Sequence, residues 1–179
     1  LAIDSSALGG MYAGAIKLVS SEAGVGVKLD GKMAASAGDI QIDANGDLTV
    51  AQVAADGAVN IEAVSANIQG AAYAGTTLEM KTRGDLSSQN NLVAKDRITL
   101  TSGGQLVNNG IIESGVNPDN TRNINADISI STQSLNNAGR NIIASRDLDI
   151  TTTQTLNNQG GTLSGQRQTT VTAGTFDNQ

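Results

Sequence analysis

The residues of this sequence that most suggest a specific activity are an arginine, a glycine and an aspartate in succession, Arg83-Gly84-Asp85. Integrins recognise this tripeptide where an exposed loop presents it, so it raises the hypothesis of cell adhesion. The surrounding sequence favours a structural role. Gly46-Asp47-Leu48 occupies the same place in an earlier segment, and Arg146-Asp147-Leu148 opens a later predicted strand. We interpret the tripeptide as a turn before Leu86, with adhesion as the alternative.

Acidic residues are the second group of candidates, because paired carboxylates hydrolyse glycosides and clustered carboxylates bind calcium. Asp147 and Asp149 would point to the same face of a strand, whereas Asp39 and Asp43 flank another strand. The segment 43–47 resembles the start of a calcium loop, but Ala54 stands where that loop needs a glutamate. We prefer solvated strand-face charge and keep a carbohydrate-active enzyme as an alternative.

The composition removes the commonest catalytic groups. The chain has no His and no Cys, which excludes imidazole bases, thiolate nucleophiles, zinc–thiolate sites and disulfides. Its net charge of −6 comes from scattered acidic residues, so a nucleic-acid partner is not expected. Gly24-Val25-Gly26 lacks the Lys-Ser/Thr of a phosphate loop. We expect no cofactor, no metal, no catalysis and no transmembrane helix.

The dominant feature of the sequence is a repeat. An apolar–polar–apolar triplet recurs along the chain, as expected for strands with one buried face. Successive triplets begin 24, 19, 19, 20, 30, 20 and 21 residues apart. Their first residues are Ile16, Ile40, Val59, Leu78, Ile98, Ile128, Leu148 and Thr169.

Further apolar residues mark one or two more strands in each repeat. A third strand is expected in several repeats, at Leu92-Val93, Ile111-Ile112, Ile142-Ile143 and Leu163. In the repeat that begins at Val59, we expect the second strand to be anchored by Val64 or Ile68. The other second-strand anchors are Leu48, Leu86, Leu106, Leu135, Leu156 and Phe176.

A repeat near 20 residues selects one fold among the all-β architectures. A propeller blade needs about 40 residues, and a sandwich gives no reason for its sequence to repeat. In a parallel β-helix, equivalent strands of successive coils stack, so a repeated sequence follows directly. We therefore predict an all-β parallel β-helix of about eight or nine coils. The alanine-rich segments 33–37 and 63–74 are predicted to be strands within it.

Asparagine doublets follow the apolar residues, most clearly in two Leu-Asn-Asn-x-Gly copies that begin at Leu135 and Leu156. Asn tolerates the left-handed backbone region and bonds to nearby backbone groups, which suits turns. Stacked Asn side chains also exchange amide hydrogen bonds along cross-β structures. We expect turn or ladder roles for Asn108, Asn109, Asn136, Asn137, Asn157 and Asn158.

The 30-residue interval contains residues 113–125 and the only proline of the chain. A turn-rich insertion into one coil should leave the stack as a loop and then return. We expect a loop at 113–125, with Asn117, Pro118, Asp119 and Arg122 as candidate contact residues for a partner.

The repeat also predicts the domain organisation. We expect residues 1–179 to form a single β-helical unit, with irregular first coils at 1–36 and the clearest repeats at 126–179. Both ends of the sequence fall inside the pattern, so we expect a segment of a longer protein. Open ends of such a stack expose strand edges, which predicts end-to-end self-association of the isolated segment.

Two features resemble filamentous haemagglutinin-type exoproteins. These include adhesins and contact-dependent growth inhibition toxins exported by two-partner secretion in Gram-negative bacteria. Residues 7–14, followed by Ile16 and by 22–27, resemble the block after their secretion domain, and the Leu-Asn-Asn-x-Gly units resemble their haemagglutinin repeats. The resemblance implies a right-handed β-helix on the bacterial surface and an outer-membrane transporter as export partner.

The resemblance also implies what the segment is for. It would be a shaft that follows the secretion domain and carries adhesin or toxin domains outward. Those other domains would contact the target cell. A direct adhesion module and, less favoured, a carbohydrate-active enzyme remain the alternatives.

Overall fold

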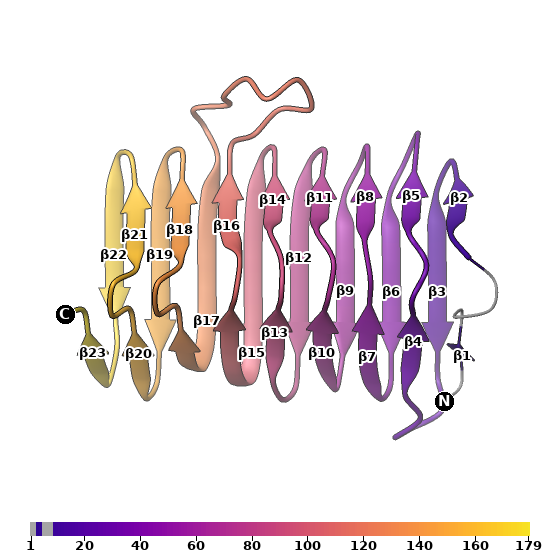
Figure 1. Ribbon diagram of the computed structural model, residues 1–179, viewed down its shortest axis with the longest axis horizontal. Coiled ribbons are helices and arrows are strands. Elements are labelled where there is room, and N and C mark those ends of the chain that lie inside the picture. The colour runs from indigo at the N-terminus through magenta and orange to yellow at the C-terminus, as the bar shows by residue number, and fades with distance from the viewer. Residues whose placement is uncertain (1–2, 5–8) are drawn as a thin grey trace.

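The computed structural model describes residues 3–4 and 9–179 and is built from β-strands stacked in successive coils (Figure 1). No helix occurs among these residues. Each full coil contributes a strand or part of a strand to each of three rows, and every strand pairs in parallel with its equivalents in the neighbouring coils. The predicted parallel β-helix is therefore confirmed.

The first row contains the longest strands. It is formed by β3 (Ile16–Ser20), β6 (Ile40–Ala44), β9 (Val59–Ala63), β12 (Thr77–Thr82), β15 (Arg97–Asn108), β17 (Asp127–Asn136), β19 (Asp147–Thr152) and β22 (Gln168–Thr172).

The second row follows it across a corner. It is formed by β1 (Ile3–Asp4), β4 (Val27–Leu29), β7 (Asp47–Val50), β10 (Ser65–Ile68) and β13 (Leu86–Ser88), by the later parts of β15 and β17, and by β20 (Thr155–Asn157) and β23 (Thr175–Asp177).

The third row is an eight-stranded sheet. It is formed by β2 (Met11–Ala13), β5 (Met33–Ala35), β8 (Val53–Ala55), β11 (Ala72–Ala74), β14 (Leu92–Ala94), β16 (Ile111–Ser114), β18 (Asn141–Ala144) and β21 (Thr162–Gly165).

The coils wind in a right-handed sense. In Figure 1 the chain advances from right to left, the nearer strands of the second and third rows run upward, and the paler, more distant first row runs downward. This hand is the one that parallel crossover connections adopt almost without exception, because each strand carries a right-handed twist. Each coil advances the stack by about 4.8 Å, the spacing of hydrogen-bonded strands.

The core is a set of aliphatic ladders. The first residues of the eight sequence triplets all fall on one ladder, where each is paired with the equivalent residue of the next coil. Within it, Ile40, Leu78 and Ile98 are completely buried. Alternate residues of each strand point inward, so a thin interior is filled by Ile, Leu, Val, Ala and two Met side chains, without aromatic rings.

One predicted anchor was wrong. In the third repeat, neither Val64 nor Ile68 stacks on the leucines of the neighbouring coils. Ala66 pairs with both Leu48 and Leu86. Ala66 is buried at the ladder position that leucine occupies in the neighbouring coils. Because alanine is small, the pattern of large apolar anchors in the sequence did not identify it.

The alanine-rich segments are strands, as predicted. Met33–Ala35 is β5, and β10 and β11 lie between residues 63 and 74. Of the block at 7–14, Ala7 and Leu8 lie outside the described residues, whereas β2 stacks on β5 in register. The first described coils thus join the same three rows as the later ones.

The segment that leaves the stack connects β16 to β17 and projects above the upper edge of the coils in Figure 1. Glu113 and Ser114 remain in β16, so the excursion spans 115–126. Ser114 is in register with Ala94, and Asp127 is in register with Arg97. Two residues make this connection in the preceding coil, and twelve make it here, so the insertion adds ten residues.

Candidate functional site

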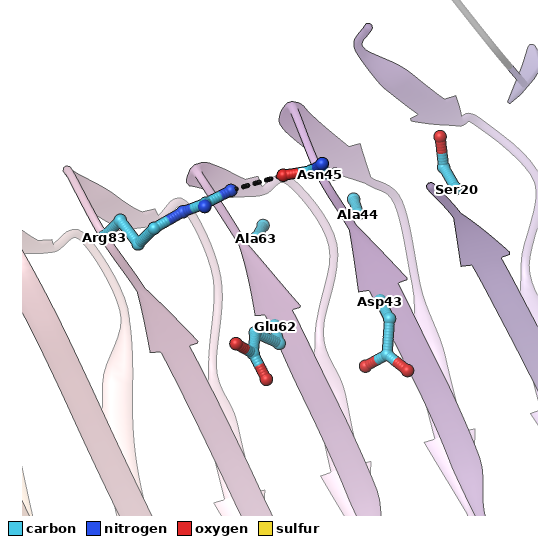
Figure 2. A pocket seen from close by; sticks show the side chains of 7 residues that line it. All are labelled: Ser20, Asp43, Ala44, Asn45, Glu62, Ala63 and Arg83. Carbon is cyan, nitrogen blue, oxygen red and sulfur yellow. Dashed lines mark hydrogen bonds between the residues drawn. The ribbon is translucent and has the colours of Figure 1, made fainter. Parts of the chain in front are cut away.

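The tripeptide Arg83-Gly84-Asp85 forms the corner between β12 and β13 and is built into the stack. Arg83 donates from Nη2 to the Asn45 Oδ1 atom at 2.7 Å (Figure 2). The Gly84 carbonyl accepts hydrogen bonds from the Thr82 and Ser102 hydroxyls at 2.8 and 2.7 Å. This corner is supported from three coils and does not project as a loop.

Asp85 is also engaged by its neighbours. Its Oδ1 accepts a hydrogen bond from the Gln105 backbone N–H at 2.8 Å, and its carbonyl accepts one from Ala66 N at 3.0 Å. In the same way, Asp39 Oδ1 accepts a hydrogen bond at 2.8 Å from the backbone N–H of Ala58, which lies in the next coil. These aspartates therefore hold corners of successive coils together, which favours the turn interpretation of the tripeptide.

The inserted segment folds into a small hairpin. Val116 and Arg122 form an antiparallel bridge, and Asn117 N donates to the Thr121 carbonyl at 2.9 Å. Asn120 N donates to the Asn117 carbonyl at 2.9 Å, and Asn120 has a φ of 63°. This is a type I turn with Pro118 at its second position, followed by a left-handed residue, a common three-residue hairpin connection.

Side chains fix the hairpin to the coils below it. The Tyr73 hydroxyl donates to the Val116 carbonyl at 3.1 Å. Asn123 donates to the Lys95 carbonyl at 2.9 Å, and Arg122 forms an ion pair with Glu113. Burial raises the pKa of the Tyr73 hydroxyl, and the nearby carboxylates of Asp96, Asp56 and Asp119 raise it further. Asn117, Pro118 and Asp119 lie at the tip, and Arg122 lies on the stem.

Four asparagines form a hydrogen-bonded ladder at the corner after the second row. Asn108 Nδ2 donates to Asn137 Oδ1, and Asn137 Nδ2 to Asn158 Oδ1, each at 2.7 Å. Asn158 Nδ2 donates to Asn178 Oδ1 at 2.6 Å. The exposed fractions of Asn108, Asn137 and Asn158 are 2%, 0% and 3%. Asn178 was not among the residues predicted from the sequence, because it does not belong to a doublet.

Of the other doublet asparagines, Asn136 and Asn157 end strands β17 and β20, whereas Asn109 lies in a turn. Asn136 and Asn157 accept hydrogen bonds from the backbone N–H groups two residues later. Asn109 is exposed and donates to Gln89 Oε1 at 3.0 Å. The doublets are offset, since Asn108 is the first of its pair whereas Asn137 and Asn158 are the second of theirs. The glycine of each Leu-Asn-Asn-x-Gly copy, Gly139 or Gly160, has a positive φ.

A row of ion pairs, not predicted from the sequence, lies between the third row and the first. Arg146 donates from Nε and Nη2 to the two carboxylate oxygens of Asp127, at 2.7 and 2.6 Å. Arg167 pairs with Asp147 in the next coil. The Arg146 hydrogen bond lowers the pKa of Asp127 to about 2, and the Arg167 hydrogen bond lowers the pKa of Asp147. Asp147 is thus a structural carboxylate, and its candidate partner Asp149 is exposed on the outer face.

A groove lies along the corner where the first-row strands β3, β6 and β9 end (Figure 2). Its volume is about 290 Å³. Ala44 and Ala63 line its floor, Asp43 and Glu62 one side, and Asn45 and Arg83 the other, and Ser20 lies at one end. We refer to these seven residues as the corner groove.

Neither a cluster of metal ligands nor a membrane-spanning helix occurs among the described residues. Within 3–4 and 9–179, no three or more acidic side chains gather as a metal site. The same part of the chain contains no helix that is long and apolar enough to cross a membrane.

The stacked coils, the 20-residue repeat and the asparagine corners define a β-solenoid. The haemagglutinin repeat model matches residues 1–52, 35–110 and 119–179. The chain belongs to the haemagglutinin repeat family.

Several curated proteins are similar to the chain. A Toxin CdiA of Escherichia coli is 34% identical over 179 residues, which is 99% of this chain and 5% of that protein. A tRNA nuclease CdiA of Yersinia mollaretii is 41% identical over 107 residues, or 59% of this chain and 4% of that protein. The tRNA nuclease CdiA-2 of Burkholderia pseudomallei is 58% identical over 50 residues, or 28% of this chain and 2% of that protein.

The chain therefore spans about one twentieth or less of the length of the relatives it matches. No solved structure matches it. The region shared with the CdiA proteins is a solenoid of haemagglutinin repeats, and the resemblance found in the sequence is confirmed.

Proposed function

We propose that this chain is a non-catalytic shaft segment of a large CdiA-type filament, exported to the bacterial surface by an outer-membrane two-partner-secretion transporter. The segment extends the filament and carries adhesin or toxin domains toward other cells. The observation that carries the proposal is the uninterrupted stacking of equivalent strands along the whole described chain. In such a stack each coil contacts its neighbours, so length and stiffness arise by repetition.

The nuclease activities in the names of the relatives belong to those proteins. The engaged side chains at the corners of this segment support a structural role. Arg83, Asp85 and Asp147 are each bound to another coil. We infer that toxin and receptor-binding functions lie in other parts of the longer protein, and that this segment separates them from the membrane.

A shaft should tolerate changes in coil number and not tolerate loss of stiffness. Val59 pairs with Leu78, so deletion of residues 59–77 removes one coil and joins equivalent positions. We expect the longer protein with this deletion to keep its activity against target cells. A matched variant replaces residues 40–127 with a flexible Gly-Ser linker of equal length, and we expect it to lose most of that activity.

The outcome is measured as growth inhibition of, or adhesion to, target cells at equal surface expression. Equal activity of the linker variant would overturn the shaft proposal, because a flexible tether would then suffice. Loss of activity in the one-coil deletion, with the segment still folded by circular dichroism, would indicate that a particular coil has a direct role.

The second candidate is direct adhesion through the hairpin. It is favoured by the exposure of its tip, where Pro118, Asp119 and Asn120 are free of packing against the coils, and by the anchoring of its stem. Replacing Asn117, Pro118, Asp119 and Arg122 with alanine would then abolish binding of the isolated segment to cells. A shaft role predicts that the same variant binds cells no differently from the parent segment.

A further inference from the structure

The chain contains two Asn-Gly pairs, and both lie in connections between strand rows. Asn45-Gly46 joins β6 to β7, and Asn109-Gly110 joins β15 to β16. Asparagine followed by glycine is the dipeptide most prone to deamidation, because glycine has no side chain to keep its backbone nitrogen away from the preceding carboxamide. In a folded protein the reaction also requires the carboxamide and the turn to rearrange. The contacts of each pair therefore decide whether it reacts.

Asn45 is held at both ends of its carboxamide. Its Nδ2 donates to the Ser21 carbonyl at 3.2 Å, and its Oδ1 accepts from Arg83 at 2.7 Å on the rim of the corner groove (Figure 2). Its backbone N–H donates to the Ser20 carbonyl at 2.9 Å, and its carbonyl accepts from Gly24 N at 2.8 Å. The guanidinium makes the side-chain carbonyl more electrophilic, but ring closure would have to break hydrogen bonds to two other coils. The stack therefore protects this pair.

Asn109 is held at one end of its carboxamide only. Its side chain is exposed, and its Nδ2 donates at 3.0 Å to Oε1 of Gln89, which is exposed as well. Within the described part of the chain, no group donates to its Oδ1. The Gly110 N–H donates to Asn108 Oδ1 at 3.1 Å, and this bond has to open before the nitrogen can attack. The carboxamide of Asn109 can therefore rotate while the coils stay stacked.

We propose that Asn109 is a site of spontaneous deamidation in the folded segment, with water as the only co-reactant, and that Asn45 is not. The Gly110 nitrogen gives up its proton and bonds to Cγ of Asn109, while the Cγ–Nδ2 bond breaks and ammonia leaves with that proton. Water then opens the succinimide ring at one of its two carbonyls. Opening at the side-chain carbonyl yields aspartate. Opening at the backbone carbonyl yields isoaspartate, whose main chain is longer by one methylene.

The corner has room for the longer product and a cation beside the new carboxylate. Three residues (108–110) connect Val107 to Ile111, whereas four residues (137–140) connect the residues that pair with them in the next coil. The step between these turns is a groove of about 370 Å³ that Arg140 lines and that no acidic residue lines. Deamidation therefore adds a negative charge at this corner without placing it next to another carboxylate.

The experiment compares the two Asn-Gly pairs within one molecule. The folded segment is incubated at mildly alkaline pH and physiological temperature, and samples are digested for mass spectrometry. Deamidation replaces NH2 by OH, so a product peptide is heavier, and the aspartate and isoaspartate forms separate by chromatography. We expect the Asn109 peptide to react at least about tenfold faster than the Asn45 peptide, since only the latter requires contacts between coils to open. In the urea-unfolded segment the two rates should agree within about twofold.

The matched control variant is Asn109→Gln. It keeps an exposed carboxamide, but the longer side chain would have to close a six-membered ring, so the product should disappear from this peptide alone. Gly110 is left in place, because a Cβ added there would lie 2.3 Å from the Asn90 carbonyl oxygen.

Two results would overturn the proposal. One is a rate at Asn45 in the folded segment that equals or exceeds the rate at Asn109. The other is an unreactive Asn109 in the folded segment under conditions where the unfolded segment reacts. The readout is independent of export and of any activity of the longer protein, so its failure leaves the shaft proposal untouched.

Discussion

The asparagine corner and the hairpin are two solutions to the same problem, how the chain turns from one strand row to the next. At the asparagine corner, Asn108, Asn137 and Asn158 are buried and bonded to each other along the stack. At the hairpin, residues 115–126 leave the stack; the turn at 117–121 bonds within itself, and only the stem is tied to other coils, through Tyr73 and Asn123. The asparagine corner links coils through buried side chains, whereas no hydrogen bond joins the hairpin tip at 117–121 to another coil in the described part of the chain.

The difference between the two corners indicates where this solenoid can tolerate changes in sequence and length. A buried carboxamide that serves two neighbours is costly to lose, because each neighbour then keeps an unpaired polar group. A hairpin that returns the chain to the same strand register costs mainly the entropy of loop closure, and this free-energy cost grows slowly with loop length. Variation in this solenoid should therefore concentrate at the hairpin and avoid the asparagine corner.

The largest effect is expected at the centre of the ladder. Asn137→Ala removes the acceptor of Asn108 and the donor to Asn158, so we expect the free energy of unfolding to fall by about 3 kcal/mol. Urea denaturation followed by circular dichroism measures it. The control Asn109→Ala removes an exposed amide of the adjacent turn and should cost under about 0.5 kcal/mol. Equal losses in the two variants would contradict the proposed ladder.

The ion pair at Asp127 should contribute less and should depend on pH. Its folded pKa of about 2 lies below the ordinary aspartate pKa of 3.8, so its stabilisation is complete above about pH 4 and is lost as pH falls through 2. We expect Asp127→Asn to cost about 1 kcal/mol at pH 7, after allowance for solvent screening. The difference from the parent segment should shrink steadily between pH 4 and pH 2 in urea titrations. A difference that stays constant would exclude the carboxylate as its source.

Removing the hairpin should change stability little. Lys95 and Asp96 join β14 to β15 in the preceding coil, so the matched variant replaces residues 115–126 with Lys-Asp. We expect the free energy of unfolding to stay within about 1 kcal/mol of the parent value, because the core ladders are unaffected. Thermal and urea unfolding test this. A cooperative loss of structure would show that the hairpin is needed for the stack.

The smallest effect concerns the tether of the hairpin. Tyr73→Phe removes the 3.1 Å hydrogen bond to the Val116 carbonyl and leaves the ring in place. We expect global stability to change by less than about 0.5 kcal/mol, and hydrogen exchange at Asn117 and Asn120 to become several-fold faster. The amide of Leu78, within a core strand, serves as the internal reference. Unchanged exchange at the hairpin would show that Asn123 and Arg122 are sufficient to hold it.

The repeat in the sequence was enough to predict the fold class and the register of the longest strands. Every apolar–polar–apolar triplet, from Ile16 to Thr169, lies on one ladder, because stacking equivalent residues is what a repeated sequence does in a parallel β-helix. The same pattern missed Ala66, since a small residue on a core ladder leaves no apolar signal. It also treated the asparagine doublets as equivalent, although they are offset by one residue.

The polar contacts between coils could not be predicted from the sequence and are seen only in the three-dimensional structure. Asp127 and Arg146 lie 19 residues apart, and Arg83 and Asn45 lie 38 apart, so neither pair has a local signature. Asn178 joins the buried ladder and Arg83 and Asp85 bond to other coils because the stack brings turns of different coils within hydrogen-bond distance. Periodicity specifies which positions stack. The lengths of individual turns then decide which polar atoms meet, where a corner is hollow and where a hairpin departs.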